Sequence, residues 1–339
     1  MVIVAHYIGQ YPFLSIFSSS GVTMFFVLSG FLITQILIYE KVKFRVQGFS
    51  EWTKILSILK IFYIRRALRI FPLFYLVLII LFLLNYDSAR KFWGYHFFYA
   101  SNFLYSFKIS FDGLAHFWSL AVEEQFYLVW PLLILAIPGR LVSVRFFSFL
   151  IAASVVFKIC LLFLYWPNSL PSYCMMPSCV ESFASGAIAL IMCKKEIKIG
   201  NLRLLLILSL LAFIPLQVMT YWNPSDLVLF ISSAFSRTIF SFISAGVLLI
   251  AVKGYYGKIG SFFFNNRLLL LIGKISYGVY IYHMFMPRLI GFFMDKVDID
   301  LRGYGKLLFL EVFCTIGLAY ISYFYFELPV NKLKKNFKY

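Results

Sequence analysis

The sequence carries little charge for its length. Charged residues make up 13% of its 339 residues, and only 14 residues are acidic. Soluble domains carry about 25% charged residues, whereas 62% of this chain is hydrophobic. No soluble domain of ordinary size fits between the apolar runs. The composition therefore predicts a single all-α membrane domain over residues 1–339.

Cysteine is also scarce, and the five cysteines do not form the pattern of a disulfide framework. Cys160, Cys193 and Cys314 lie in apolar runs, where cysteine usually acts as a small buried hydrophobe. Cys174 and Cys179 share one short loop, and they could pair if that loop faces an oxidising compartment. The N-terminus lacks a basic region followed by a cleavage site, so we expect no signal peptide.

Positive charge is present in excess, with a net charge of +17. In a soluble protein this excess would indicate nucleic acid. Here the Lys and Arg residues lie between apolar runs, where they orient a chain in the membrane. We therefore expect membrane lipids as partners and no nucleic acid, and we expect no metal.

Apolar runs between charged or Pro/Gly-rich breaks predict a polytopic bundle of about ten helices, the first of them largely missing. A stub covers 1–8, and nine spans cover 20–39, 69–86, 117–137, 146–166, 179–193, 202–221, 226–252, 268–294 and 304–326. The apolar stretch 92–107 is interrupted by polar groups, which is typical of a re-entrant or interfacial piece.

The distribution of Lys and Arg over the loops predicts the orientation. Alternate loops, with the tail, carry 21 of these residues: 40–69, 138–145, 194–203, 253–267 and 327–339. The other loops carry only 6: 87–116, 167–178, 222–225 and 295–306. The first set, including the C-terminus, is therefore predicted to be cytoplasmic.

Ionisable residues gather in the segment HFWSLAVEEQFYLVWP. His116, Ser119 and Glu123 are spaced so that they share one helical face, while Glu124 points elsewhere. A carboxylate in a low-dielectric environment can serve as a general acid or base. Alternatively, the two glutamates simply mark the outer end of the helix, near its N-terminal dipole.

A second cluster is FYIRRALRIFPLFY. Arg65, Arg66 and Arg69 lie where a cytoplasmic loop is expected to enter a span, and arginines there are ordinary orientation signals. Guanidinium groups also bind phosphates through paired hydrogen bonds. Three arginines within five residues exceed what orientation requires, so this segment predicts a site for a phosphorylated donor.

A third feature is SSSGVTMFFVLSGFLIT. Gly21 and Gly30, with small serines around them, favour close helix packing in a membrane. A gap that admits an extended ligand is the alternative.

Histidines in apolar segments are candidates for function, because an ionisable group is costly inside a membrane. His6, His116 and His283 fall in this class, and a hydrogen-bonded structural role is an equal alternative for each of them. His96, among aromatic residues, is expected to be interfacial and structural.

Taken together, five segments resemble the acyltransferase-3 family of integral membrane acyltransferases. They are VIVAHY, GVTMFFVLSGFLI, YIRRALRIFP, HFWSLAVEEQFYLVWP and ISYGVYIYHM, and they extend from the first residue to about residue 290. The resemblance implies a ten-helix enzyme of the bacterial inner membrane. It implies transfer of an acyl group, commonly acetyl, from cytoplasmic acyl-coenzyme A to a hydroxyl of a surface or lipid-linked glycan, such as polysaccharide or lipopolysaccharide.

The resemblance also implies residue roles. His6 matches a histidine proposed as catalytic, and Arg66 and Arg69, with Arg65 beside them, match arginines thought to hold the coenzyme phosphates. Glu123 and Glu124 fall in the family's acidic motif, and His116 and His283 fall in motifs whose roles are less settled. We expect His116, Glu123 and Glu124 to act catalytically on the acceptor side, and Ser119, Tyr277 and His283 to bind the acceptor.

Two departures from the family pattern stand out. Members usually have an arginine upstream of the His6 position, so we expect most of that first helix to be missing, through a late start or in a truncated, inactive relative. Many members also carry an acidic residue where Thr23 stands. Its role would be vacant or taken by Glu123 or Glu124.

A transporter or flippase of polysaccharide intermediates is the alternative from another class, since intramembrane His and Glu also serve proton relays. The arginine cluster and the lack of an evident inverted repeat favour the enzyme. Consumption of acyl-coenzyme A would separate the two.

Overall fold

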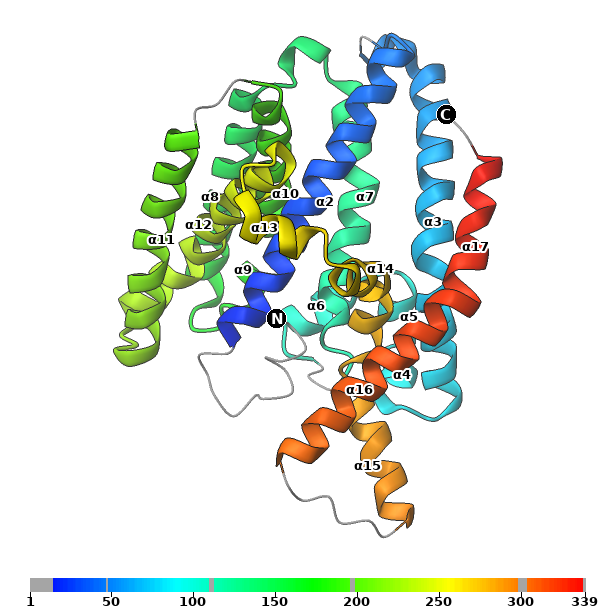
Figure 1. Cartoon of the computed structure of the whole chain (residues 1–339). Helices are drawn as coiled ribbons and strands as arrows, with labels where there is room; N and C mark the ends of the chain where they lie inside the picture. Colours follow the sequence, from blue (N-terminus) through cyan, green and yellow to red (C-terminus); the bar gives the residue numbers. More distant parts are fainter. Residues whose placement is uncertain (1–14, 47, 110–112, 196–198, 298–303, 338–339) are drawn as a thin grey trace.

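The computed structural model describes residues 15–46, 48–109, 113–195, 199–297 and 304–337, and every regular element in these residues is helical (Figure 1). Within them, eight segments are long and apolar enough to cross a membrane. These segments contain the helices α2 (Ser15–Lys43), α3 (Trp52–Leu83), α7 (Phe117–Ala136), α8 (Val144–Tyr165), α10 (Met176–Cys193), α11 (Ile199–Trp222), α12 (Asp226–Lys253) and α16 (Tyr304–Ser322). The prediction of an all-α polytopic bundle is confirmed.

The basic motif lies inside a helix rather than at its entrance. Helix α3 begins at Trp52 and has 32 residues, which makes it about 48 Å long at ~1.5 Å per residue. The predicted span 69–86 was therefore wrong at its start. The three arginines lower the local hydropathy but are good helix formers, so the helix runs through them.

The predicted span 268–294 is also wrong, because the chain breaks there into α14 (Arg267–Tyr282) and α15 (Met286–Val297). Pro287 lies in the first turn of α15, where its missing N–H is tolerated. A proline has no N–H to donate to the carbonyl four residues earlier, and its ring clashes there, so α14 cannot continue through His283 into α15. The break places His283 at the end of α14, and α14 packs against α16.

The segment between α3 and α7 forms three short helices, α4 (Asp87–Lys91), α5 (Trp93–Phe97) and α6 (Ser101–Ser106), each too short to cross a membrane. His96 is buried there and its Nδ1 lies 2.9 Å from Ser101 Oγ, in agreement with a structural role. Asn102 and Gln125 exchange side-chain hydrogen bonds of 3.4 and 3.0 Å, which fasten α6 to α7.

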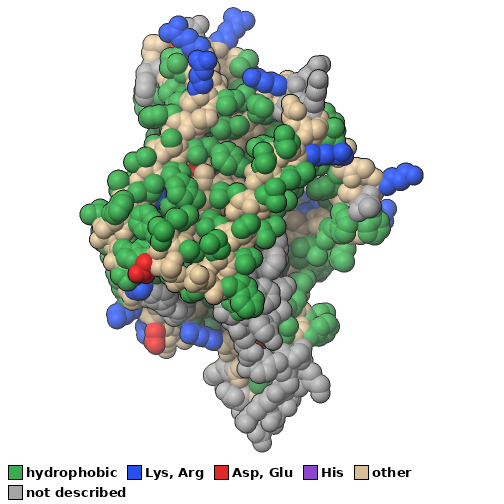
Figure 2. Space-filling model, turned by 90° about the vertical axis from the view of Figure 1, so that its left-hand side faces the viewer, with side chains coloured by type: hydrophobic (Ala, Val, Ile, Leu, Met, Phe, Trp, Pro, Cys, Tyr) green, Lys and Arg blue, Asp and Glu red, His purple; other side chains and the backbone are tan. Residues whose placement is uncertain are grey.

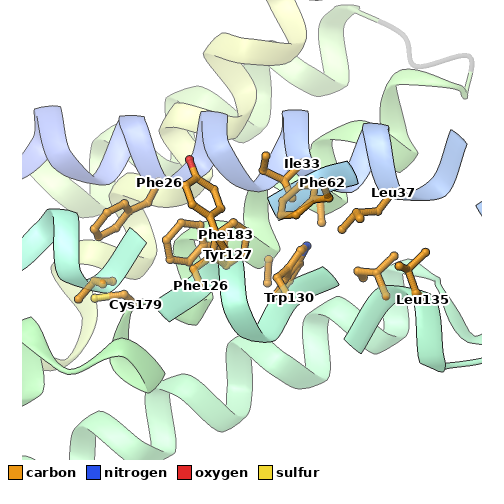
Figure 3. Close-up of a cluster of buried hydrophobic side chains, with 14 of the residues drawn as sticks. Phe26, Ile33, Leu37, Phe62, Phe126, Tyr127, Trp130, Leu135, Cys179 and Phe183 are labelled. Atoms are coloured by element: carbon orange, nitrogen blue, oxygen red, sulfur yellow. The ribbon is translucent and has the colours of Figure 1, made fainter. Parts of the chain in front are cut away.

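The core lies between α2, α3, α7 and α10 (Figure 3). Phe126 of α7 stacks on Phe183 of α10 with ring centroids 3.8 Å apart. A β-carbon added to Gly30 of α2 would lie 2.0 Å from Phe183 O, and one added to Gly186 of α10 would lie 1.9 Å from Val27 O. The absence of a side chain at Gly30 therefore allows close helix packing. This confirms the packing interpretation at this glycine.

The ends of α2, α3 and α7 follow the alternation predicted from charge. The C-terminal ends of α2 and α7, the start of α3 and the C-terminus lie together at the top of Figure 1. We call this the basic end of the bundle. Lys41 stabilises it by donating to the α7 carbonyls of Ile134 (2.7 Å) and Leu135 (3.1 Å), as cations commonly do at a helix C-terminus.

The outer surface of the bundle around α11 is apolar. Helix α11 packs on α12 and has a single buried residue, Leu202, among its described side chains. Figure 2 shows hydrophobic side chains covering the middle of one face, with most Lys and Arg side chains toward its margins. A helix that exposes apolar side chains all round is suited to contact with lipid.

The smaller helices α9 (Leu170–Cys174), α13 (Gly257–Phe264) and α17 (Leu328–Lys332) complete the described chain. Helix α9 carries Cys174, which is buried, as is Cys179 at the start of α10. Both are free thiols, so the disulfide considered for this loop does not form in the structure.

Candidate active site

The three motif arginines line a cavity between α2 and α3. It has a volume of about 380 Å³, with walls from the second half of α2, from α3 and from the C-terminal tail. Its lining residues are Gln35, Ile36, Tyr39, Glu40, Phe62, Arg65, Arg66, Arg69 and Lys334. Four cations against one carboxylate make this donor cavity, as we name it, a favourable place for an anion.

Arg65 has a different function from its two neighbours. Its Nη1 donates to the carbonyls of Lys334 at 3.3 Å and Phe337 at 2.8 Å. These bonds hold the C-terminal tail beside α3. They also bring the Lys334 side chain to the cavity.

Arg66 connects the donor cavity to the acidic motif of α7. Its guanidinium carbon lies 5.5 Å from the ring centroid of Phe62 and 5.2 Å from that of Tyr127, within the range of a cation–π contact. The hydroxyl of Tyr127 in turn donates to Glu123 Oε1. The two motifs therefore meet in one site, although the sequence placed them on opposite sides of the membrane.

Glu123 is the central group of this connection. Its side chain is buried, with the residue 5% exposed, and Ser29 of α2 donates to Oε1 at 3.2 Å. Arg66 and Arg69 lie close enough to interact with its charge. A buried carboxylate needs such partners, because isolated burial of a charge is costly.

Glu124 points to a different, aromatic side of α7. It interacts electrostatically with Tyr75, Tyr99 and Tyr277, and its Oε1 is buried without a hydrogen-bond partner among the described residues. Burial raises the pKa of Tyr99 above its usual value. Tyr277 donates to Ile70 O at 2.7 Å, one residue after Arg69.

The remaining predicted residues, His116, Ser119 and His283, belong to a buried cluster between α7 and α14. His116 Nε2 lies 3.2 Å from Ile281 O, and Tyr280 donates to His116 O at 3.0 Å and contacts Ser119 Oγ. The rings of His116 and His283 lie 4.9 Å apart. The side chains of His116, Ser119 and His283 do not line the donor cavity. Their catalytic and acceptor-binding roles stay predictions.

His6 lies outside the described residues. The structure places Arg66 and Arg69 in the donor cavity and Glu123 close enough to interact with their charges. It places His116, Ser119 and His283 apart, in the buried cluster between α7 and α14.

Comparison with known proteins decides the family. A family model described as an acyltransferase domain matches residues 1–327. The chain belongs to this acyltransferase domain family. No solved structure matches it.

Curated relatives of this acyltransferase domain include proteins of Staphylococcus aureus and Listeria monocytogenes. O-acetyltransferase OatA of Staphylococcus aureus (strain NCTC 8325 / PS 47) is 27% identical over 94% of this chain and 53% of its own length. Peptidoglycan O-acetyltransferase OatA of Listeria monocytogenes is 26% identical over 92% and 51%. The putative O-acetyltransferase SACOL0978 of S. aureus (strain COL) is 28% identical over 92% and 52%. The chain spans about half the length of the curated relatives it matches.

Several polar residues that contribute to the site in the acyltransferase domain were not singled out from the sequence. Lys334 belongs to the donor cavity, and Ser29 and Tyr127 hold Glu123. Glu327 ends a π-helical turn over Tyr323–Glu327 and interacts with Arg69; such turns are common at functional sites.

A further group was missed although the sequence carries a signal for it. Lys158, Glu181 and Arg237 are charged residues inside apolar spans, and intramembrane charges are candidates for function.

Proposed function

We propose that the chain is a membrane O-acetyltransferase that takes an acetyl group from acetyl-coenzyme A at the basic end of the bundle. The acceptor is a hydroxyl of a glycan on the opposite side of the membrane. The observation that carries this proposal is the donor cavity, where Arg66 and Arg69 lie beside the buried Glu123.

The donor cavity suits coenzyme A by its charge. Coenzyme A carries several phosphate charges, and guanidinium groups bind phosphates through paired hydrogen bonds. Arg66, Arg69 and Lys334 supply cations from two segments of the chain. Their contribution is to position the thioester rather than to react with it.

The reaction transfers one acyl group and one proton. The acceptor hydroxyl oxygen attacks the thioester carbonyl, its proton passes to a base, the carbon–sulfur bond breaks, and coenzyme A leaves as a thiol. We propose His6 as the base, or as the carrier of a covalent acetyl intermediate, because a neutral imidazole is available near pH 7. Glu123 and Glu124, with His116, would assist on the acceptor side.

The names of the relatives support both the acetyl transfer and the glycan acceptor in this proposal. All three are O-acetyltransferases, and the Listeria protein is named for peptidoglycan. We extend this to the present chain as a bacterial cell-surface glycan acceptor, with the basic end facing the cytoplasm in accordance with the positive-inside rule.

The test supplies labelled acetyl-coenzyme A to membranes that contain the chain. Label should appear as alkali-labile O-acetyl groups in the glycan fraction, and His6→Ala should abolish the transfer. A transporter would move glycan without consuming acetyl-coenzyme A, and that result would replace the proposal with its alternative. Absence of both activities would indicate an inactive relative.

A further inference from the structure

A second buried polar cluster lies away from the donor cavity. Lys158 of α8 and Glu181 of α10 form an ion pair with Nζ and Oε1 2.7 Å apart, and their side chains are 1% and 0% exposed. Thr238 of α12 donates to Glu181 Oε2 at 2.6 Å. Three helices are thus joined by one carboxylate.

Arg237, one residue before Thr238, adds a second buried cation. Its Nη1 donates to Cys179 Sγ at 3.1 Å, its Nη2 donates to Tyr173 O at 2.6 Å, and its guanidinium carbon lies 4.3 Å from the Tyr173 ring centroid. These partners are a thiol, a carbonyl and a ring, so none of them is a carboxylate.

The charges of this cluster do not balance. Arg237 lies close enough to Lys158 for their like charges to repel each other, and the Glu181 carboxylate interacts with both cations. Two cations therefore face one anion. Buried charges are normally compensated, because leaving one unpaired is strongly unfavourable.

Both cations line a cavity of about 190 Å³. Hydroxyl and amide groups from α2, α9, α11 and α12 form much of its wall: Ser19, Ser20, Thr23, Ser172, Gln217, Ser232, Ser233 and Ser236. Tyr173, Phe213 and Phe240 add aromatic surface. Many hydroxyl groups, aromatic faces and one surplus positive charge suit a ligand that is hydroxylated, cyclic and anionic.

This cavity lies toward the opposite end of α2 from the donor cavity. It contacts α2 at residues 19–23, whereas the donor cavity contacts α2 at residues 35–40. The two are therefore roughly 25 Å apart along the helix. Ser29, which donates to Glu123, lies between them.

We propose that this serine-lined cavity binds an acidic saccharide, with Arg237 and Lys158 neutralising its negative group. The inference rests on the proposed function, since it assigns the acceptor's charged sugar residue to this cavity and the reacting hydroxyl to the region between the two cavities. The acidic group is a carboxylate or a phosphate.

The test measures binding of three probes to the purified full-length chain in nanodiscs: methyl glucuronide, methyl glucoside and glucose 6-phosphate. We expect a charged probe to bind at least roughly tenfold more tightly than the neutral glucoside, as a charge-assisted contact requires. The stronger of the two charged probes identifies the acidic group. Equal binding of all three, or no binding, would overturn the inference.

Two variants sharpen the test. Gln217→Glu adds a carboxylate to the cavity wall and should abolish the preference for the charged probes. Asn223→Asp places the same charge at an exposed position after α11 and should leave the preference unchanged. Loss of the preference in both variants, or in neither, would contradict a specific site.

Binding of acetyl-coenzyme A, measured on the same samples, separates this inference from the proposed function. If acetyl-coenzyme A binds and the charged probes show no preference, only the serine-lined cavity is wrongly assigned. If acetyl-coenzyme A does not bind, the proposed function fails, whatever the probes show.

Discussion

Arg66 lies with its guanidinium carbon 5.2 Å from the ring centroid of Tyr127, across the interface between α3 and α7. This contact joins the motif that faces the donor cavity to the motif that carries Glu123. It makes the donor cavity and the acidic motif parts of one site.

Tyr127→Phe should reduce turnover without weakening donor binding. The substitution removes the hydroxyl that donates to Glu123 but keeps the ring next to Arg66. We expect kcat to fall roughly ten- to hundredfold, since a hydrogen bond to a charged group is lost, while KM for acetyl-coenzyme A changes little. Tyr63→Phe, which removes a hydroxyl bonded to Leu128 O, is the control. Unchanged kcat in Tyr127→Phe would remove Glu123 from the chemistry.

Arg66→Ala and Arg69→Ala should each raise KM for acetyl-coenzyme A roughly tenfold, because each removes a charge-assisted contact to phosphate. Lys60→Ala removes an exposed cation from the same helix and should have no such effect. Steady-state kinetics on purified protein in nanodiscs provides both values. An equal effect of all three substitutions would indicate general electrostatics instead of a binding site.

Glu181→Gln should destabilise the protein more than Lys158→Met. The first substitution leaves both buried cations without a carboxylate, whereas the second leaves Glu181 to neutralise Arg237. We expect a loss of about 3–5 kcal/mol for Glu181→Gln, the usual cost of an uncompensated buried charge. Thermal unfolding in detergent measures both, and the reverse order would contradict the charge imbalance.

Gly186→Ala should destabilise the bundle, because the added methyl group would clash with the backbone of α2. Its new β-carbon would lie 1.9 Å from Val27 O, so the two helices must separate. Overpacking of this kind costs about 1–3 kcal/mol. Gly317→Ala adds a methyl group where no atom lies within 4 Å and should be nearly neutral. Comparable melting temperatures for the two variants would show that α2 and α10 can move apart easily.

Much of the fold follows from local pattern, and the exceptions have physical reasons. Predominantly apolar spans, such as 117–137 and 226–252, match α7 and α12 closely. The start of α3 was misplaced because hydropathy falls at Arg65–Arg69 although helix propensity does not. The break before Pro287 was missed because the flanking sequence stays apolar.

The site was predictable only in part. The arginine motif marked three residues of the donor cavity, but the fourth cation, Lys334, comes from the far end of the sequence. No local pattern indicates that contact, because tertiary structure alone brings the tail to α3. The approach of Glu123 to Arg66 also depends on tertiary structure. Counting charges in the loops assigns each loop to one side of the membrane, but it does not show which side chains meet between two packed helices. The cluster of Lys158, Glu181 and Arg237 was visible in principle, since each is a charge within an apolar span.

The sidedness of acetyl transfer tests the central claim most directly. Sealed vesicles of both orientations, each containing the chain, would receive labelled acetyl-coenzyme A outside. The account predicts consumption only where the basic end faces the added donor, with the O-acetyl product on the other side of the membrane. Equal consumption in both orientations, or product on the donor side, would contradict it.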